Sequence, residues 1–290
     1  MRATPAALLT RLLPAAWLLA LVAAPLLLVL AIALSWPADG VPPFTLPWSG
    51  GQGSEGRGAN PEAFALILGD GFYGGAFLGS VQAAGATAAL CLLLGFPMAF
   101  GIVRAGPAWR GPLLLAMLLP FWTGFLPRLG AWIGILRDEG WINGVLLSLG
   151  LIEAPLPLLY STPALLLGML HAYLPFAVLP LYASLSRLDP ALEEAAADLG
   201  AGRWTAFATV TLPLVAPGAA AAFLLVFIPA AGEYVIPELL GPPGAQMVGR
   251  VLWQEFFQNR DWPVAAALAV LLLLALLLPI LLFQRLEARR

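Results

Sequence analysis

The stretch LDPALEEAAADLGAGRWTAFATVTLPLVAPG, residues Leu188–Gly218, decides how the rest of the sequence is interpreted. It begins as a helix does, because Asp189 is placed to cap the first turn and Pro190 stands at the first helical position. Gly200 then ends this helix, and a second short segment leads to Pro213. The pattern predicts an amphipathic helix–turn–helix elbow, which by itself is also typical of an ordinary helix at a membrane surface.

The composition around this elbow is that of a protein dissolved in lipid. Hydrophobic residues make up 61% of the 290 residues and charged residues only 10%, with a mean hydropathy of +0.90. About a quarter of the residues of a soluble domain are charged, and a transmembrane helix needs roughly 20 mostly apolar residues. We therefore expect an all-α integral membrane protein with six transmembrane helices, at about Leu12–Trp36, Phe77–Val103, Leu113–Leu136, Thr162–Ser186, Leu214–Ile236 and Pro263–Phe283.

The scarcity of some residue types excludes several classes of function. All 14 basic residues are arginine, so the chain lacks the lysine with which a P-loop holds nucleotide phosphates. Cys91 is the single cysteine and His171 the single histidine, which leaves no disulfide and no cluster for a metal or for catalysis. The net charge of −2 gives no reason to expect a nucleic-acid partner. We expect no catalytic residue, no metal and no cofactor on this chain.

The arginines also indicate how the chain crosses the membrane, since cytoplasmic loops carry an excess of them. With a cytoplasmic N-terminus, more arginines fall inside than outside, so we expect both termini in the cytoplasm. The inside segments then hold Arg2, Arg11, Arg104, Arg110, Arg187, Arg203, Arg285, Arg289 and Arg290, against Arg57, Arg137, Arg250 and Arg260 outside.

We expect a single transmembrane domain over residues 1–290, without a separate soluble domain. Residues 1–36 form an N-terminal anchor helix, whose apolar run is too long for the core of a secretory signal. Residues 37–75 form an external loop that includes the Gly-rich stretch GQGSEGRGAN. Residues 76–290 form a five-helix core, with the elbow at residues 187–213 on its cytoplasmic side.

The elbow resembles the EAA loop of ABC importer permeases. That pattern reads E-A-A, three residues, G, nine residues, I, one residue, L-P, and this sequence departs from it only by Val210 in place of isoleucine. In the family, this loop is the coupling helix that docks into a groove of a separate ATPase subunit. The resemblance implies that role for Glu194, Ala195, Ala196, Gly200, Leu212 and Pro213.

Further segments resemble the permeases of spermidine and putrescine importers, and most closely the putrescine-type subunit. The resemblance implies the type I ABC importer permease fold in a bacterial cytoplasmic (inner) membrane. It also implies several partners: a pair of ATPase subunits that bind ATP and Mg²⁺, a second permease that is a different homologous chain, and a periplasmic or extracellular solute-binding protein. The segments are Phe64–Val81, Leu118–Leu136, Tyr173–Ala201, Phe227–Gly241 and Met247–Val270.

The solute stays open between polyamines and the ferric iron, thiamine, phosphonates or opines that related permeases carry. A secondary transporter is a weaker alternative. Such proteins place carboxylates near the bilayer midplane and often show repeated halves, and this sequence shows neither.

Candidate residues of the translocation pathway lie in the apolar spans. Glu233 and Tyr234 fall toward the outer end of span five, and Arg128 falls within span three. An ion pair between Glu233 and Arg128 would act as a latch or gate; otherwise Glu233 is a substrate carboxylate or is solvated at the interface. Trp122 and Tyr173 stand beside prolines at deeper positions, where they line the pathway or pack within the bundle.

Overall fold

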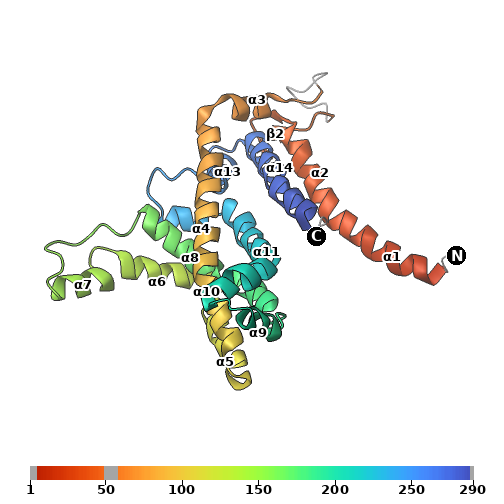
Figure 1. The fold of residues 1–290 in the computed structure, drawn as a ribbon. Coiled ribbons are helices and arrows are strands. Elements are labelled where there is room, and N and C mark those ends of the chain that lie inside the picture. The colour runs from red at the N-terminus through yellow and green to blue at the C-terminus, as the bar shows by residue number, and fades with distance from the viewer. Residues whose placement is uncertain (1–4, 49–57, 288–290) are drawn as a thin grey trace. The chain divides into compact units, whose positions relative to one another are not determined.

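The computed structural model describes residues 5–48 and 58–287, and these residues are mostly helical (Figure 1). They fall into two compact units. The first comprises the described parts of Met1–Gly75 together with Val251–Ala275, and the second comprises Ala76–Arg250 together with the described part of Leu276–Arg290. Two long helices, α4 (Gly71–Arg104) and α14 (Trp262–Glu287), begin in the first unit and end in the second.

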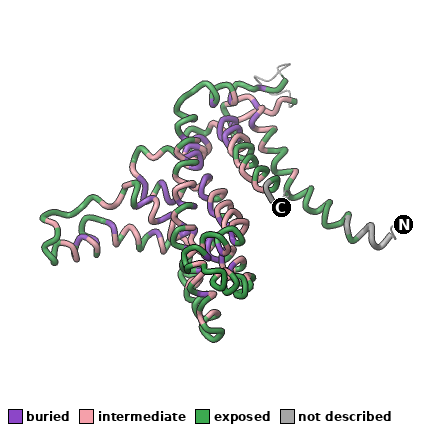
Figure 2. The backbone as a smooth tube through the Cα atoms, viewed as in Figure 1, coloured by how far each residue is buried: buried purple, intermediate pink, exposed green. Residues whose placement is uncertain are grey.

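The first unit begins with a long apolar helix whose side chains are mostly exposed, as expected of a helix that faces lipid (Figure 2). A two-stranded antiparallel sheet follows, in which Trp36 pairs with Thr45. The other elements of this unit, besides the starts of α4 and α14, are α1 (Pro5–Leu18), the π-helical turn η1 (Leu19–Ala23), α2 (Ala24–Ala33), β1 (Trp36–Pro37), β2 (Phe44–Thr45), α3 (Glu62–Gly69), the end of α13 (Val248–Trp253) and the π-helical turn η4 (Gln254–Gln258).

The expected external loop, residues 37–75, has more regular structure than its composition indicates. It contains β2 and α3, and α4 begins at Gly71 rather than at Phe77. Aromatic packing holds the sheet, because the ring of Phe44 lies 5.8 Å from that of Trp262, which in turn stacks on Phe256 at 4.5 Å. Most of the Gly-rich stretch lies at residues 49–57, outside the described residues.

The second unit holds the main hydrophobic core. Besides the ends of α4 and α14 and the start of α13, its elements are α5 (Pro107–Leu118), the 3-10 turn η2 (Leu119–Thr123), α6 (Phe125–Leu136), α7 (Trp141–Ser148), α8 (Thr162–Leu185), α9 (Pro190–Asp198), α10 (Arg203–Ala206), the π-helical turn η3 (Phe207–Thr211), α11 (Leu212–Ala231) and α12 (Val235–Leu240).

Small residues let α8 and α11 pack closely in this core. Ala177 and Val178 of α8, and Ala222 and Val226 of α11, are fully buried. A Cβ atom on Gly218 would overlap the hydroxyl of Ser184, so glycine is required where the two backbones approach. Close contact through small side chains is the usual way in which helices associate inside a membrane.

Among the described residues, five helices are long and apolar enough to span a membrane: Leu12–Ala33, Gly71–Arg104, Thr162–Leu185, Arg203–Ala231 and Trp262–Arg285. A sixth span exists if the bent pair Pro107–Thr123 and Phe125–Ser148, which meet at 89°, is counted as one. The all-helical membrane fold with six spans is confirmed in that sense. The third span was expected as one stretch, Leu113–Leu136, but it breaks at Gly124, whose φ of +85° ends the turn η2.

Candidate functional site

The elbow starts as its sequence predicts. The Oδ1 atom of Asp189 accepts a hydrogen bond of 3.0 Å from the backbone N–H of Ala191, and Pro190 is the first residue of α9. This cap satisfies a backbone donor that the helix leaves unpaired, and the fixed φ of proline suits the first helical position. The start of the elbow helix is therefore set by residues next to it in the chain.

The turn at Gly200 forms a Schellman motif. Gly200 donates to the carbonyl of Ala197 at 2.9 Å, and Ala201 donates to that of Ala196 at 3.0 Å. Gly200 has a φ of +86°, and a Cβ atom there would meet nothing within 4 Å. Glycine is thus needed for the backbone conformation and not for space. A bulky side chain at this position would point out of the elbow, into space that the described chain leaves open.

The second arm of the elbow is continuous with a membrane span. Residues Arg203–Ala231 form one helix, made of α10, the π-helical turn η3 and α11. Pro213 lies in the first turn of α11, directly after the π-helical turn, where its missing N–H is tolerated. Leu212 and Pro213 therefore belong to the same continuous helix as the second arm of the elbow.

One glutamate ties the elbow to the rest of its unit. Glu193 forms an ion pair with Arg104 at the end of α4, and it accepts a hydrogen bond of 2.8 Å from the Thr211 hydroxyl. The guanidinium of Arg104 also lies over the ring of Phe100, 4.8 Å from its centre. Sequence reasoning missed this role of Glu193, because the motif points to Glu194. The available signal was Arg104, the basic residue in the last turn of α4.

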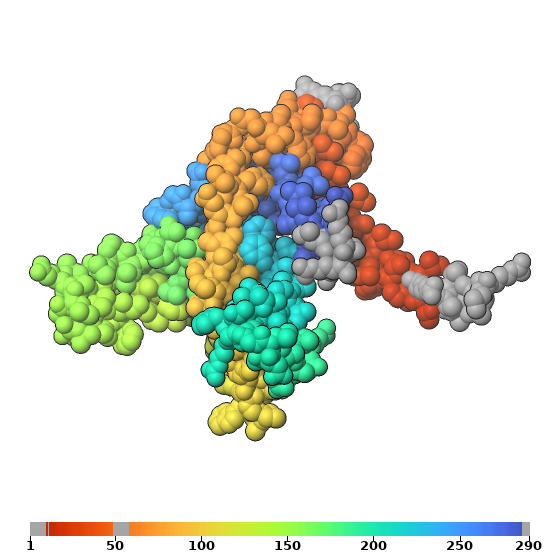
Figure 3. Space-filling view, viewed as in Figure 1, coloured from red at the N-terminus to blue at the C-terminus, as the bar shows by residue number. Residues whose placement is uncertain are grey.

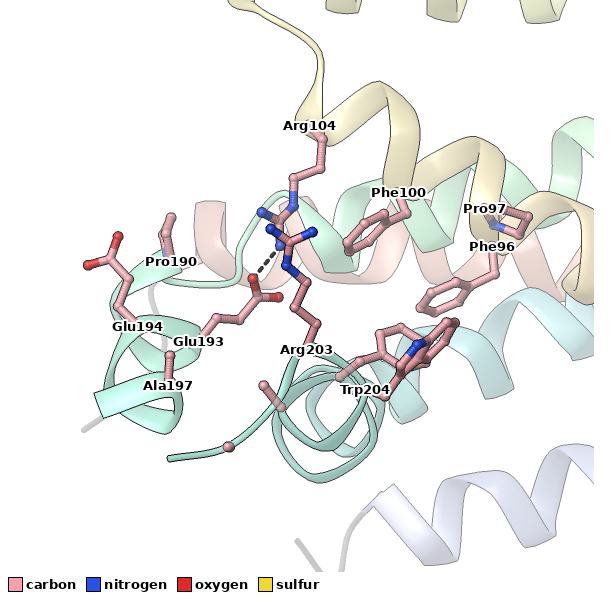
Figure 4. Close-up of a pocket in the computed structure, with 13 residues that line it drawn as sticks. Phe96, Pro97, Phe100, Arg104, Pro190, Glu193, Glu194, Ala197, Arg203 and Trp204 are labelled. Carbon is pink, nitrogen blue, oxygen red and sulfur yellow. Dashed lines mark hydrogen bonds and ion pairs between the residues drawn. The ribbon is translucent and has the colours of Figure 1, made fainter. Parts of the chain in front are cut away.

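The motif residues themselves face outward. Glu194 and Ala195 are exposed and Ala196 is partly buried. Figure 4 shows the Glu194 carboxylate pointing away from Arg104 and Arg203. The elbow also exposes three large apolar side chains, and it forms an uncovered part of the surface in Figure 3. Exposure is 46% for Leu192, 90% for Leu199 and 83% for Trp204.

A groove of about 990 Å³ lies between the elbow and the end of α4 (Figure 4). Phe96 and Phe100 of α4 line one side, and Phe207 of the elbow packs edge-on against both of them, with ring centres 5.6 and 6.5 Å away. Arg104 and Arg203 line the same groove, and Arg203 points toward Arg104 and Glu193. The groove is therefore aromatic along its wall and basic at one end.

The expected pathway residue Glu233 makes three hydrogen bonds. The Tyr173 hydroxyl donates to its Oε2 at 2.6 Å, and the backbone N–H groups of Tyr234 and Val235 donate to its Oε1 at 3.0 Å. These last two bonds cap the start of α12. The structure thus brings Tyr173 and Glu233 together, from two elements of the same unit.

The expected ion pair between Glu233 and Arg128 is not formed in the described part of the chain. Arg128 donates to the carbonyl of Gly124 at 3.0 Å, and its guanidinium lies 5.1 Å from the ring centre of Phe121. The break at Gly124 separates α6 from η2, so Arg128 lies in the first turn of a new helix. Trp122, in the turn before the break, is 75% exposed.

Within residues 5–48 and 58–287, no three histidine, cysteine, aspartate or glutamate side chains gather as metal ligands do. The carboxylates described above accept hydrogen bonds from this chain or face outward.

Comparison with known proteins agrees with this arrangement. The model of the family "binding-protein-dependent transport system inner membrane component" matches residues 2–290. The spermidine/putrescine transport system permease protein PotB of Haemophilus influenzae is 37% identical over 206 residues, which cover 71% of this chain and 72% of PotB. PotB of Escherichia coli K12 is 36% identical over 195 residues, which cover 67% of this chain and 71% of that protein.

A solved structure has the same fold. The crystal structure of a bacterial ABC transporter that imports the acidic polysaccharide alginate contains a chain with a TM-score of 0.68 and 20% identity, over 97% of this chain and 95% of that one. The expected importer permease fold is thereby confirmed, as is a multi-pass location in the bacterial inner membrane. The structure has the helices of a multi-pass membrane protein, and the family model matches nearly the whole length of the chain. This chain therefore belongs to the inner membrane components of binding-protein-dependent transport systems.

Proposed function

We propose that this chain is one of two permease subunits of an ATP-driven importer for polyamines such as putrescine and spermidine. Together with a second, homologous permease it forms the translocation pathway. The observation that carries the substrate class is the similarity to spermidine/putrescine permeases, at 36–37% identity over about 70% of the chain. The solute is delivered from outside by a binding protein, which the family name already implies.

The elbow is the part that couples this chain to ATP. Leu192 and Leu199 are apolar side chains of the elbow that are too exposed for a membrane-surface loop without a partner. Small side chains at Ala195 and Ala196 allow a partner to approach closely, and Glu194 adds an orientable charge at the rim. The elbow docks on the ATPase subunit, which holds ATP and Mg²⁺ and performs the hydrolysis; this chain contributes no bond chemistry.

Movement of the elbow reaches the membrane by two routes. The first is the continuous helix from Arg203 to Ala231, which carries it into α11. The second is Glu193, which links α9 to the end of α4 through Arg104 and to η3 through Thr211. Closure of the ATPase pair thus shifts two spans together, as alternating access requires.

The pathway residue with the best support is Glu233. Its carboxylate accepts hydrogen bonds from a hydroxyl and two backbone N–H groups, and it forms no ion pair with an arginine within the described residues. A carboxylate beside the ring of Tyr173 suits the passage of an organic polycation. Tyr234 is exposed next to it and widens the same aromatic surface. Arg128 donates to the carbonyl of Gly124 and forms no ion pair with Glu233 in the described part of the chain.

The test is transport by the reconstituted complex. Proteoliposomes contain this chain with a second permease, an ATPase and a binding protein of the same importer. We expect binding protein loaded with putrescine or spermidine to stimulate ATP hydrolysis and labelled polyamine to accumulate inside. Ferric iron, thiamine and a phosphonate serve as matched alternatives, each with the same complex. Stimulation by one of these, and not by a polyamine, would refute the substrate class and leave the permease role intact.

A further inference from the structure

We propose that the groove between the elbow and the end of α4 binds one anionic phospholipid. The groove measures about 990 Å³ and is lined on one side by Phe96 and Phe100. Trp204 and Phe207 from the elbow close the other side, with ring centres 6.2 Å apart. Nothing in the described chain fills it.

The groove has the polarity of a lipid along its length. Arg104 lies at the end of α4, and Phe96 lies eight residues earlier, about 12 Å along the helix at 1.5 Å per residue. The basic end is therefore at the end of the spanning helix, and the aromatic wall runs back along it. A phospholipid has the same polarity, with its phosphate at one end and its acyl chains at the other.

The charges at the basic end favour an anion. Arg203 points toward the pair formed by Arg104 and Glu193 (Figure 4), so two guanidinium groups face one carboxylate there. Glu193 is already engaged by Arg104 and Thr211, and Arg203 forms no ion pair within residues 5–48 and 58–287. Glu194 stands at the edge with its carboxylate turned away. A phosphate between the two arginines supplies the missing negative charge in a geometry that guanidinium groups bind well.

Native mass spectrometry of the detergent-solubilised complex tests this proposal. After delipidation, phosphatidylglycerol is titrated in, with phosphatidylcholine as the neutral comparison. We expect one tightly retained phosphatidylglycerol for each copy of this chain. Arg203→Gln is expected to weaken its affinity about fivefold, the ratio that corresponds to roughly 1 kcal/mol for one basic residue near an anionic lipid surface.

Two further variants separate a groove from a generally basic surface. Arg187→Gln removes the same charge from an exposed position that does not line the groove, and should leave phosphatidylglycerol binding unchanged. Ala201→Trp fills the groove without removing a charge, and should weaken binding as much as Arg203→Gln does.

Three outcomes would overturn the proposal: equal losses in Arg187→Gln and Arg203→Gln, undiminished binding in Ala201→Trp, or displacement of the lipid by inorganic phosphate alone. A segment of a partner subunit cross-linked to position 201 in place of lipid would overturn it as well. Lipid retention is measured without transport, so it does not depend on which solute the complex carries.

Discussion

Replacing Glu193 by alanine should uncouple ATP hydrolysis from transport. The change breaks the ion pair with Arg104 and leaves the hydroxyl of Thr211, which is only 1% exposed, without its acceptor. The side chain of Arg104 is 57% exposed, so the ion pair contributes only about 0.5 kcal/mol. An unsatisfied buried hydroxyl costs about 1–3 kcal/mol. Together these changes weaken the link between the elbow and its neighbours by about 2 kcal/mol, or roughly 30-fold in an equilibrium constant.

The assay measures polyamine uptake and ATP hydrolysis in the same proteoliposomes. We expect Glu193→Ala to lower the uptake per ATP hydrolysed by at least about tenfold. The weakened link sets an upper limit of roughly 30-fold. Glu193→Gln keeps an acceptor for Thr211 and loses only the ion pair, so its loss should be several times smaller. Thr211→Val combined with Glu193→Ala should be no worse than Glu193→Ala alone, because both changes remove the same hydrogen bond.

Glu194→Ala is the matched control, since this neighbouring carboxylate faces outward. It should weaken association with the ATPase while the uptake per ATP stays at the wild-type value. If Glu193→Ala transported as much per ATP as wild type, the link through Arg104 and Thr211 would play no part in coupling.

Three other substitutions follow from the structure. Gly200→Ala should destabilise the elbow by about 1 kcal/mol because its φ is +86°, whereas Gly200→Asn should cost less; equal melting temperatures for the two would contradict this. Gly218→Ala should lower the melting temperature of the purified chain by overlapping Ser184, and Ser184→Gly in the same chain should restore it; Gly101→Ala, with open space around it, is the control. Glu233→Gln keeps the size of the side chain and removes its charge, so polyamine uptake should fall about tenfold or more while ATPase association is unchanged; unaltered uptake would exclude Glu233 from the pathway.

The elbow could be predicted from sequence because its signals are local. Asp189, Pro190 and Gly200 each act on backbone groups within a few residues, and each has the role that its position indicates. The spans could be predicted for a similar reason, since apolar length alone decides whether a helix fits the bilayer. Both inferences rest on residues close together in the chain.

Contacts between distant residues could not be predicted in this way. Arg104 and Glu193 are 89 residues apart, and only the folded chain shows that they pair. The break at Gly124 lies in a continuous apolar run, where glycine and proline are common without causing a bend. Because of that break, Arg128 lies in the first turn of a new helix. The expected pairing with Glu233 had assumed an unbroken third span.

The docking of the elbow on an ATPase can be measured by site-specific cross-linking. Cys91 is the single cysteine of the sequence and is fully buried in α4, so a cysteine introduced at Leu199, where the side chain is 90% exposed, is the accessible thiol of this chain. With a thiol-specific photoactivated cross-linker in native membranes, Leu199→Cys should link this chain to the ATPase subunit, with a yield that changes when ATP binds. Leu149→Cys, at a position 66% exposed on the opposite side according to the arginine distribution, should not form that link. Absence of the link from Leu199→Cys, or an equal yield from Leu149→Cys, would contradict the proposed coupling role.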